Sequence, residues 1–342
     1  MNILEKLPKP FFVLAPMDEV TETVFRRIVQ LAAPADLYFT EFVNVDGLQS
    51  PGRPNLLKKL RLTDGEGPLI AQLWGLRAEN FEKTAEEIAS GRMARELCEQ
   101  HGHDELVQKD SKHLCPDFVG IDINMGCPAK SEVQNGACSA LIKNRPLASE
   151  IIKATKKGVA NAGSDMPVSV KTRLGFNEID FTWHEFLLQH DIDMLTVHFR
   201  TRKQMSKVPA EWQHAETIIK LRDEISPKTK IVGNGDVMSR MMGEGLAVRY
   251  RLDGIMIGRG IFHDPFVFAK ESPWLNYTKQ QKIELLRRHI TLFSETWGGG
   301  ERRYETLKKF AKVYIHEFDG AKELREEIMN TSTAEEALSL LN

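Results

Sequence analysis

Short hydrophobic runs alternate with longer amphipathic segments along most of the chain. A run of five to seven mostly apolar residues is typical of a strand buried on both faces, whereas apolar residues that recur every three or four positions predict a helix with one buried side. Strands are expected at residues 11–17, 37–42, 68–73, 118–124, 167–172, 193–198, 230–234 and 253–257. Helices are expected between them at residues 21–31, 78–89, 139–142, 147–161, 181–190, 211–223 and 238–248. Eight strands separated by helices predict a (β/α)8 TIM barrel.

The last part of the chain follows a different pattern. Residues 274–342 contain no strand candidate, and their periodicity predicts helices at 278–297, 302–318, 320–329 and 333–341. We therefore expect a barrel domain over residues 1–270 and a separate C-terminal all-α helical domain over residues 274–342.

Two segments interrupt the alternation of strands and helices. Residues 44–67 hold Gly, Pro and basic residues and predict a long loop, with a small hairpin near residues 56–62. Residues 90–116 are charged and rich in histidine, and we interpret them as an insertion before the fourth strand. Five of the residues in it are of types that bind zinc: Cys98, His101, His103, His113 and Cys115. A structural zinc is one hypothesis for this segment, but the predicted active site contains no metal, because the insertion leads into a strand at the opposite face of the barrel.

Composition narrows the class of protein only a little. The 342 residues are 42% hydrophobic and 27% charged, with no apolar run long enough to cross a bilayer and no signal-peptide pattern at the start. Four cysteines in a chain of this length do not resemble a disulfide framework, so the cytoplasm is the expected compartment. The formal net charge of -2 does not decide whether the protein binds nucleic acid, because that depends on local basic surface.

Polar residues of chemical interest follow the predicted strands, at the end where a barrel of this type builds its active site. They are Gln72, Asn124, Cys127, Lys171, Arg173, His198, Asn234 and Asp236. Any one of them could be structural or merely solvated. Polar residues at five strand ends in one register are harder to explain that way, and they predict a shared site. Within it, Gly126 and Pro128 flank Cys127 and hold it off the end of its strand.

Two glycine motifs follow the seventh and eighth predicted strands, where this fold commonly binds phosphate. They are Gly233-Asn234-Gly235-Asp236 and Gly258-Arg259-Gly260. Glycine permits close approach of a ligand to the backbone, and Arg259 can add a charged contact. A phosphorylated cofactor is therefore expected. Lys171 could form a Schiff base, as in aldolases, or place a positive charge beside a cofactor ring that becomes anionic on reduction, and its spacing alone does not choose between these roles.

The combined motifs resemble the tRNA-dihydrouridine synthase family in its bacterial form. The resemblance runs from about residue 11 to 270, and more loosely through the helical tail. It is carried by Ala15-Pro16-Met17, Thr21, Phe25-Arg26, Thr40-Glu41, Gln72-Leu73, the segment Asp122 to Pro128, Lys171 to Gly175, Val197-His198, Arg200-Thr201-Arg202, Gly233 to Asp236 and Met256 to Gly260.

The resemblance implies a flavin enzyme that uses FMN and NADPH (or NADH) to reduce specific uridines in tRNA to 5,6-dihydrouridine. Hydride would pass from the flavin to C6 of the uracil, and Cys127 would protonate C5. A thiol suits this role, since its ordinary pKa of about 8.5 keeps it largely protonated at neutral pH. Cys138 stands where the family usually has a small residue, and we interpret it as packing.

The resemblance also implies further contacts, residue by residue. The cofactor would be bound by Pro16, Met17, Gln72, Lys171, His198, Asn234, Gly235, Asp236, Gly258 and Arg259. Asn124 and Arg200 would face the uracil. The chain departs from the family pattern in three places: Phe199 and Glu19 replace usual glycines, and the 90–116 insertion is atypical. Phe199 bears on the fit of the substrate loop.

RNA must present an extruded base, because C5 and C6 of a stacked uracil are out of reach of a flavin in a pocket. Basic residues of the tail, among them Arg302 and Arg303, are expected to contact the RNA backbone. We expect a monomer with tRNA as its partner and no obligate protein partner. Three alternatives remain open: an FMN barrel that acts on a free pyrimidine or on ribosomal RNA, an RNA-binding protein on an inactive barrel, and an aldolase that uses Lys171.

Overall fold

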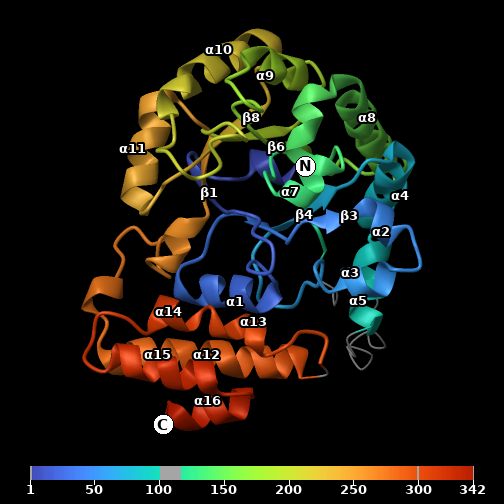
Figure 1. The fold of residues 1–342 in the computed structure, drawn as a ribbon. Coiled ribbons are helices and arrows are strands. Elements are labelled where there is room, and N and C mark those ends of the chain that lie inside the picture. Colours follow the sequence, from blue (N-terminus) through green and yellow to red (C-terminus); the bar gives the residue numbers. More distant parts are fainter. Residues whose placement is uncertain (1, 101–116, 299, 342) are drawn as a thin grey trace.

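The computed structural model describes residues 2–100, 117–298 and 300–341, and within them the strands form one parallel sheet (Figure 1). The strands are β1 (Phe11–Leu14), β2 (Tyr38–Phe39), β3 (Val43–Asn44), β4 (Leu69–Trp74), β5 (Gly120–Asn124), β6 (Val168–Arg173), β7 (Met194–His198), β8 (Lys230–Asn234) and β9 (Gly254–Ile257). Their order is β1-β9-β8-β7-β6-β5-β4-β2, with β3 also paired to β4. A parallel bridge between Val13 and Leu37 joins β1 to the start of β2, so the sheet closes. The predicted TIM barrel is confirmed.

Helices surround the barrel and bury their apolar sides against it. They are η1 (Ile3–Glu5), α1 (Thr23–Ala32), α2 (Val45–Leu48), α3 (Arg53–Leu57), α4 (Ala78–Ala89), α5 (Arg92–Gln100), α7 (Lys130–Gln134), η2 (Cys138–Lys143), α8 (Arg145–Asn161), α9 (Phe181–Leu188), η3 (Trp212–His214), α10 (Ala215–Ile225), α11 (Arg240–Tyr250) and η4 (Arg259–Phe262). In β6 to β9 nearly every side chain is buried, because helices cover the outer face and side chains fill the interior.

Two local predictions within the barrel need correction. No hairpin forms near residues 56–62; α3 ends there instead, since Pro54 suits the first turn of a helix and Leu57 and Leu60 turn into the core. The interpreted insertion begins with a regular helix, α5, whose Met93 and Leu97 are buried one turn apart. Of its five possible zinc ligands only Cys98 is described; the other four lie outside the described residues, so the zinc hypothesis is not tested.

The C-terminal residues are helical and pack beneath the barrel (Figure 1). The elements are η5 (Trp274–Asn276), α12 (Lys279–Trp297), α13 (Glu305–Lys308), α14 (Ala311–Tyr314), α15 (Ala321–Asn330) and α16 (Ala334–Leu340). The helix predicted over 302–318 is wrong, because the chain divides there into α13 and α14. Hydrogen bonds between residues three apart, such as Phe310 N to Leu307 O at 2.9 Å, tighten this stretch. Phe310 thereby stacks on Phe25 of α1, with ring centroids 4.9 Å apart.

Trp297, at the end of α12, anchors the helical region (residues 274–341) to the barrel. Its Nε1 donates a 2.9 Å hydrogen bond to Glu22 Oε2. The guanidinium of Arg61 lies 4.6 Å from the Trp297 ring centroid and donates to Thr296 O at 2.7 Å. Buried polar contacts of this kind have directional requirements, so they fix how the helical region sits on the barrel.

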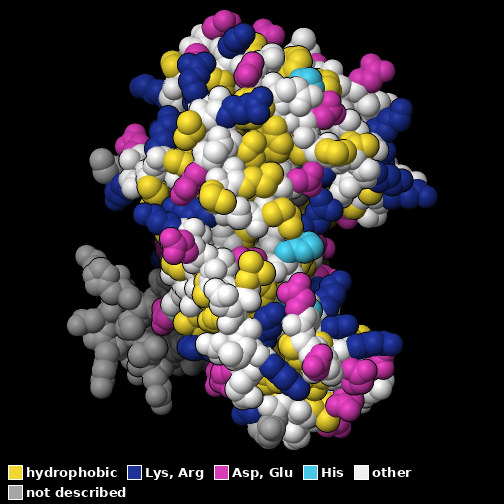
Figure 2. Space-filling model, turned by 90° about the vertical axis from the view of Figure 1, so that its left-hand side faces the viewer, with side chains coloured by type: hydrophobic (Ala, Val, Ile, Leu, Met, Phe, Trp, Pro, Cys, Tyr) yellow, Lys and Arg dark blue, Asp and Glu magenta, His cyan; other side chains and the backbone are white. Residues whose placement is uncertain are grey.

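The outer surface is mixed in charge. Figure 2 shows Lys and Arg side chains interspersed with Asp and Glu over the face that carries α11, together with exposed hydrophobic side chains. Met241 and Val248 of α11 are each 76% exposed. Among the helices that the structure describes, none has the length and apolar character needed to cross a membrane.

Candidate active site

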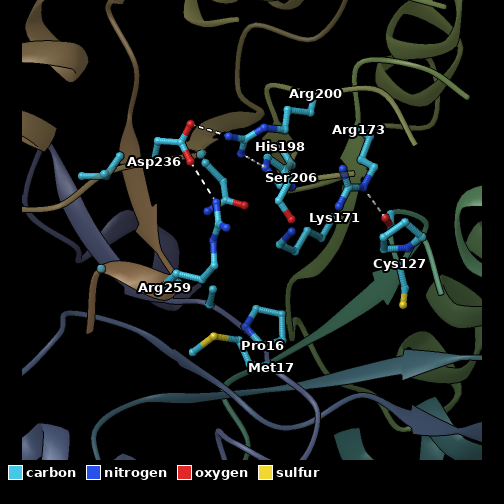
Figure 3. A pocket seen from close by; sticks show the side chains of 18 of the residues that line it. Pro16, Met17, Cys127, Lys171, Arg173, His198, Arg200, Ser206, Asp236 and Arg259 are labelled. Carbon is cyan, nitrogen blue, oxygen red and sulfur yellow. Dashed lines mark hydrogen bonds and ion pairs between the residues drawn. The ribbon is translucent and has the colours of Figure 1, made fainter. Parts of the chain in front are cut away.

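A cavity of about 440 Å³ opens at the carboxyl ends of the strands, a size typical of small-molecule sites (Figure 3). All of the predicted cofactor residues line it: Pro16, Met17, Gln72, Lys171, His198, Asn234, Gly235, Asp236, Gly258 and Arg259. Asn124, Cys127 and Arg200 line it as well. Residues that the sequence did not single out also contribute, namely Phe42, Ser206, Val237, Met238 and His263. Their loops follow strands, but their types gave no chemical signal.

One side of the cavity is lined by loop residues and by Arg259. The backbone N–H groups of Val237, Met238, Arg259 and Gly260 donate no hydrogen bond within the described part of the chain. Gly235 has a φ of 134°, and a Cβ on it would lie 2.7 Å from Ala210 Cβ, so glycine is required there. A Cβ on Gly258 would meet only Ala15 Cβ at 3.5 Å and Met17 Sδ at 3.8 Å, which leaves open space beside these amides.

Asp236 organises the cations on this side. Its Oδ1 accepts a 3.0 Å hydrogen bond from Arg259, and its Oδ2 accepts from Arg200 Nη2 and, at 3.0 Å, from Ala210 N. Burial would raise the pKa of Asp236, but the hydrogen bonds from Arg200 and Ala210 hold it below its usual value of 3.8. A carboxylate that is ionised and already paired would repel a phosphate. Asp236 therefore holds Arg259 in place at this side of the cavity, and its own contact with the cofactor stays a prediction.

Arg200 lies within the wall of the cavity, with its side chain 2% exposed. Its Nε donates to Val208 O at 2.6 Å, its Nη1 to His198 Nε2 at 3.0 Å and its Nη2 to Asp236. Figure 3 shows it beside Asp236, across the cavity from Cys127. Arg200 lines the cavity and its guanidinium donates to protein groups on the Asp236 side, while its contact with the uracil stays a prediction.

The hydrogen bond from Arg200 also fixes the tautomer of His198. A guanidinium can only donate, so Nε2 of His198 accepts and the ring proton is on Nδ1. Burial, with the nearby cations Arg173 and Lys171, lowers the pKa of His198 well below 6.5. His198 is therefore a neutral hydrogen-bond donor at the cavity.

Lys171 brings an ammonium group to the middle of the cavity (Figure 3). Its Nζ has no hydrogen-bond partner among the described residues, unlike the guanidiniums around it. Burial is the main influence on its pKa, which falls from 10.5 to about 8, and Arg173 lowers it further while Asp122 opposes the change. The group is still cationic at neutral pH, so it is suited to an acceptor or an anion brought by a ligand.

Cys127 stands on the far side of the cavity from Asp236 and Arg259 (Figure 3). Asn124 Oδ1 accepts hydrogen bonds from Gly126 N at 3.1 Å and Cys127 N at 2.9 Å. Arg173 Nε donates to Gly126 O at 2.7 Å. The loop that carries the thiol is thus held from two strands, β5 and β6. Asn124 lines the cavity as predicted, but its oxygen supports this loop.

Cys138 begins η2 beside the Cys127 loop, and the next amide along the chain, Ser139 N, donates a 3.3 Å hydrogen bond to Cys127 O. The hydrogen bond from Cys138 is the largest influence on the Cys127 thiol and lowers its pKa from 9.0 to about 7, although burial opposes the change. The pKa of Cys138 is raised in turn. Two expectations are corrected: Cys127 does not have an ordinary pKa, and Cys138 does more than fill space.

The sequence departures are accommodated by the backbone. Cys138 has a φ of 53° and Glu19 a φ of 56°, conformations that glycine adopts most readily. The Phe199 ring is buried and packs on Trp212, with ring centroids 4.7 Å apart. It therefore points away from the cavity.

The two predicted RNA contacts in the helical region differ in exposure. Arg303 is exposed. The Arg302 side chain is 7% exposed; it pairs with Glu41 and lies over the Trp297 ring, 5.2 Å from its centroid. The prediction that Arg302 contacts the RNA backbone is therefore corrected, because its guanidinium is paired with Glu41 between the barrel and the helical region. A basic hollow is lined instead by Lys308, Lys309, Lys312, Lys322 and Arg325, together with Glu326, Ala311, Met329 and Asn330.

A closed parallel barrel whose strand ends surround one cavity that holds arginines, an ammonium and a thiol has the architecture of a TIM-barrel enzyme. The chain belongs to the dihydrouridine synthase family, whose model, described as "Dihydrouridine synthase (Dus)", matches residues 13–96 and 105–342. Besides residues 1–12, the unmatched residues are 97–104, which fall within the segment that we interpreted as an insertion.

Named relatives agree with the family assignment. The chain is 41% identical over 344 residues to a "Probable tRNA-dihydrouridine synthase" of Staphylococcus aureus (strain Mu50 / ATCC 700699), covering 100% of this chain and 95% of the relative. It is also 41% identical over 345 residues to a "Probable tRNA-dihydrouridine synthase 2" of Bacillus subtilis (strain 168), covering 100% and 96%. Among solved structures, an old yellow enzyme homologue from Zymomonas mobilis matches with a TM-score of 0.43 and 13% identity, over 78% of this chain and 90% of that one.

Proposed function

We propose that this protein reduces uridines in tRNA to 5,6-dihydrouridine, with FMN as its bound cofactor and NADPH or NADH as the reductant. The observation that carries the proposal is one cavity with Arg259 and several backbone N–H groups at one side and a thiol at the other. Between them lies the Lys171 ammonium, which has no hydrogen-bond partner among the described residues. Membership of the dihydrouridine synthase family and the names of its relatives support the same activity.

The residues present fit FMN. The unpaired amides of residues 237–238 and 259–260, with Arg259, would take the phosphate, while Asn234, Gly235 and Gly258 would leave room for the ribityl chain. Lys171 and the Nδ1–H of His198 would contact the polar edge of the ring system. Pro16, Met17 and Gln72 would lie along the ring. FMN, when bound, supplies the hydride.

Cys127 would hold the proton that C5 of the uracil receives. Its thiol form is required for this, and a pKa of about 7 means that the thiol gives up its proton more readily than an ordinary cysteine while still being substantially protonated at neutral pH. Asn124 and Arg173 keep the loop in place, which reduces the freedom that must be lost before proton transfer.

Uracil would enter this cavity only after extrusion from its stack, and the RNA backbone would supply most of the affinity. The basic hollow of the helical region and exposed Arg303 are the surfaces that suit this contact. In this proposal residues 274–342 form the tRNA-binding domain, and the enzyme acts as a monomer in the cytoplasm, without an obligate protein partner.

The experiment compares substrates with one preparation of flavin-loaded enzyme and NADPH. Unmodified tRNA, a ribosomal RNA fragment and free uridine are incubated separately, and dihydrouridine is measured by mass spectrometry as a gain of two hydrogens. We expect product from tRNA only, and at least a hundredfold less from a Cys127→Ala variant that still binds FMN and oxidises NADPH. Product from free uridine at a comparable rate would contradict the proposal, and so would full activity of Cys127→Ala.

A further inference from the structure

A buried carboxylate in the barrel interior, Asp122, is connected to the Cys127 loop by a continuous chain of hydrogen bonds. Asp122 is 0% exposed and does not line the cavity. The register places it opposite Gln72 of β4 and Ser169 of β6, so the three side chains lie at one level of the barrel. Ser169 Oγ donates to Asp122 Oδ1 at 2.6 Å, and Gln72 Nε2 donates to Asp122 Oδ2 at 2.8 Å.

The chain continues from Gln72 towards the thiol. Asn124 Nδ2 donates to Gln72 Oε1 at 3.1 Å, and Asn124 Oδ1 accepts from the amides of Gly126 and Cys127. The two ends of a side-chain amide are almost the same shape, so shape alone does not decide which way Gln72 or Asn124 points. A group that can only accept, at one end of this chain of hydrogen bonds, does decide which way each amide points.

We propose that Asp122 is a positioning residue that orients the Gln72 and Asn124 amides and, through them, holds Cys127 for proton transfer. A carboxylate only accepts, so Gln72 must turn its nitrogen to Asp122 and its oxygen to Asn124. Asn124 must then turn its nitrogen to Gln72, which leaves its oxygen for the two backbone amides. With either amide reversed, donors would face the Gly126 and Cys127 N–H groups, and the loop would lose both hydrogen bonds.

Substitutions of Asp122 can separate the effect of hydrogen-bond polarity from the effect of charge. Asp122→Asn can keep the pattern, since its oxygen can accept from Gln72 while its nitrogen donates to Ser169 Oγ, which still has Ile121 O as an acceptor at 3.4 Å. Asp122→Leu has a similar shape and no acceptor. Ser169→Ala removes a hydrogen bond from the same carboxylate at the same level, but outside the path to Cys127.

The test measures amide hydrogen exchange of the peptide that contains Gly126 and Cys127, in the purified flavin-loaded enzyme. We expect about tenfold faster exchange in Asp122→Leu, the effect of one lost hydrogen bond of about 1.4 kcal/mol, and exchange within about twofold of wild type in Asp122→Asn and Ser169→Ala. Equal acceleration in Asp122→Asn or in Ser169→Ala would overturn the relay, as would unchanged exchange in Asp122→Leu. Should Asp122→Leu not fold, Gln72→Met interrupts the relay one residue later and carries the same expectation and the same refutation.

The link to catalysis rests on the proposed function, and a second readout keeps the two apart. In Asp122→Leu we expect kcat for uridine reduction to fall at least tenfold, with KM for tRNA within about twofold, because RNA binds elsewhere. Asp122→Asn should restore kcat. Faster exchange without loss of kcat would refute the positioning role but leave the relay, whereas an inactive wild type would refute the proposed function and leave the exchange result standing.

Discussion

Replacement of Cys138 by glycine should raise the pKa of the Cys127 thiol. The hydrogen bond from Cys138 is the largest cause of the drop from 9.0 to about 7, and glycine removes the donor while suiting the φ of 53° at this position. A change from pKa 7 to pKa 9 would be a hundredfold in acid dissociation, about 3 kcal/mol. Because Ala129 N and Arg173 also favour the thiolate, we expect a rise of about one to two pKa units.

Alkylation of Cys127 by iodoacetamide gives the pKa directly, since only the thiolate reacts. The rate is followed from pH 5 to 10, and mass spectrometry of the Cys127 peptide separates it from the other cysteines. Wild type should reach its half-maximal rate near pH 7. Cys138→Gly should reach its half-maximal rate at about pH 8 to 9. At pH 7 its smaller thiolate fraction should slow alkylation about five- to fiftyfold, and the higher nucleophilicity of the more basic thiolate should offset part of this decrease.

Cys138→Ser is the matched control, because its hydroxyl can still donate to the Cys127 sulfur and should keep the midpoint near pH 7. The catalytic profile should move in the same direction. The thiol form donates the proton, so single-turnover uridine reduction should decline in wild type as pH rises through about 7, and in Cys138→Gly only above about pH 8. A midpoint of Cys138→Gly that stays at pH 7 would refute the role of Cys138.

Three other substitutions test separate parts of the site. Arg302→Met should lower the free energy of unfolding by about 3 kcal/mol, because it leaves the Glu41 carboxylate buried without its partner, whereas Arg303→Met should change thermal stability little and weaken tRNA binding; equal melting temperatures in the two variants would contradict this. Lys171→Met should cut the rate of flavin reduction by NADPH at least tenfold with the protein still folded, and an unchanged rate would mean that its ammonium has no part in the chemistry. Arg259→Ala should weaken FMN binding by about ten- to a hundredfold in fluorescence titration, with Arg251→Ala, a surface arginine, as the control.

The pattern of hydrophobic residues was sufficient to predict the barrel. The residues at the end of each predicted strand were sufficient to predict most of the cavity lining. Lys171 and Cys127 could be found because a barrel strand can direct a polar residue at its end only to a few places. Arg200 and Arg302 could not be placed, since a long side chain can reach in several directions and its partners, Asp236 and Glu41, are distant in sequence. The hydrogen bond from Cys138 depends on a left-handed backbone conformation that residue type does not reveal.

The helical region likewise combines features that the sequence pattern predicts with features that depend on contacts between distant residues. Most of its helices were visible from their periodicity, but the break between α13 and α14 was not. Phe310 lies at this break and stacks on Phe25, a residue distant in sequence. For Asp122, the sequence indicated a motif but not the role of this residue within it. It stood inside a recognised motif, yet its connection to Cys127 through Gln72 and Asn124 becomes visible only when β4 and β5 lie side by side in register.

We propose that this chain makes dihydrouridine in tRNA and that Cys127 supplies the proton. The most direct test maps dihydrouridine across all tRNAs, by mass spectrometry, in the source organism with its own copy deleted, and then after return of either the wild-type chain or Cys127→Ala. We predict that one or more specific positions lose the modification on deletion, regain it with the wild-type chain and stay unmodified with the variant. A deletion that leaves every position modified, or full restoration by Cys127→Ala, would contradict the account.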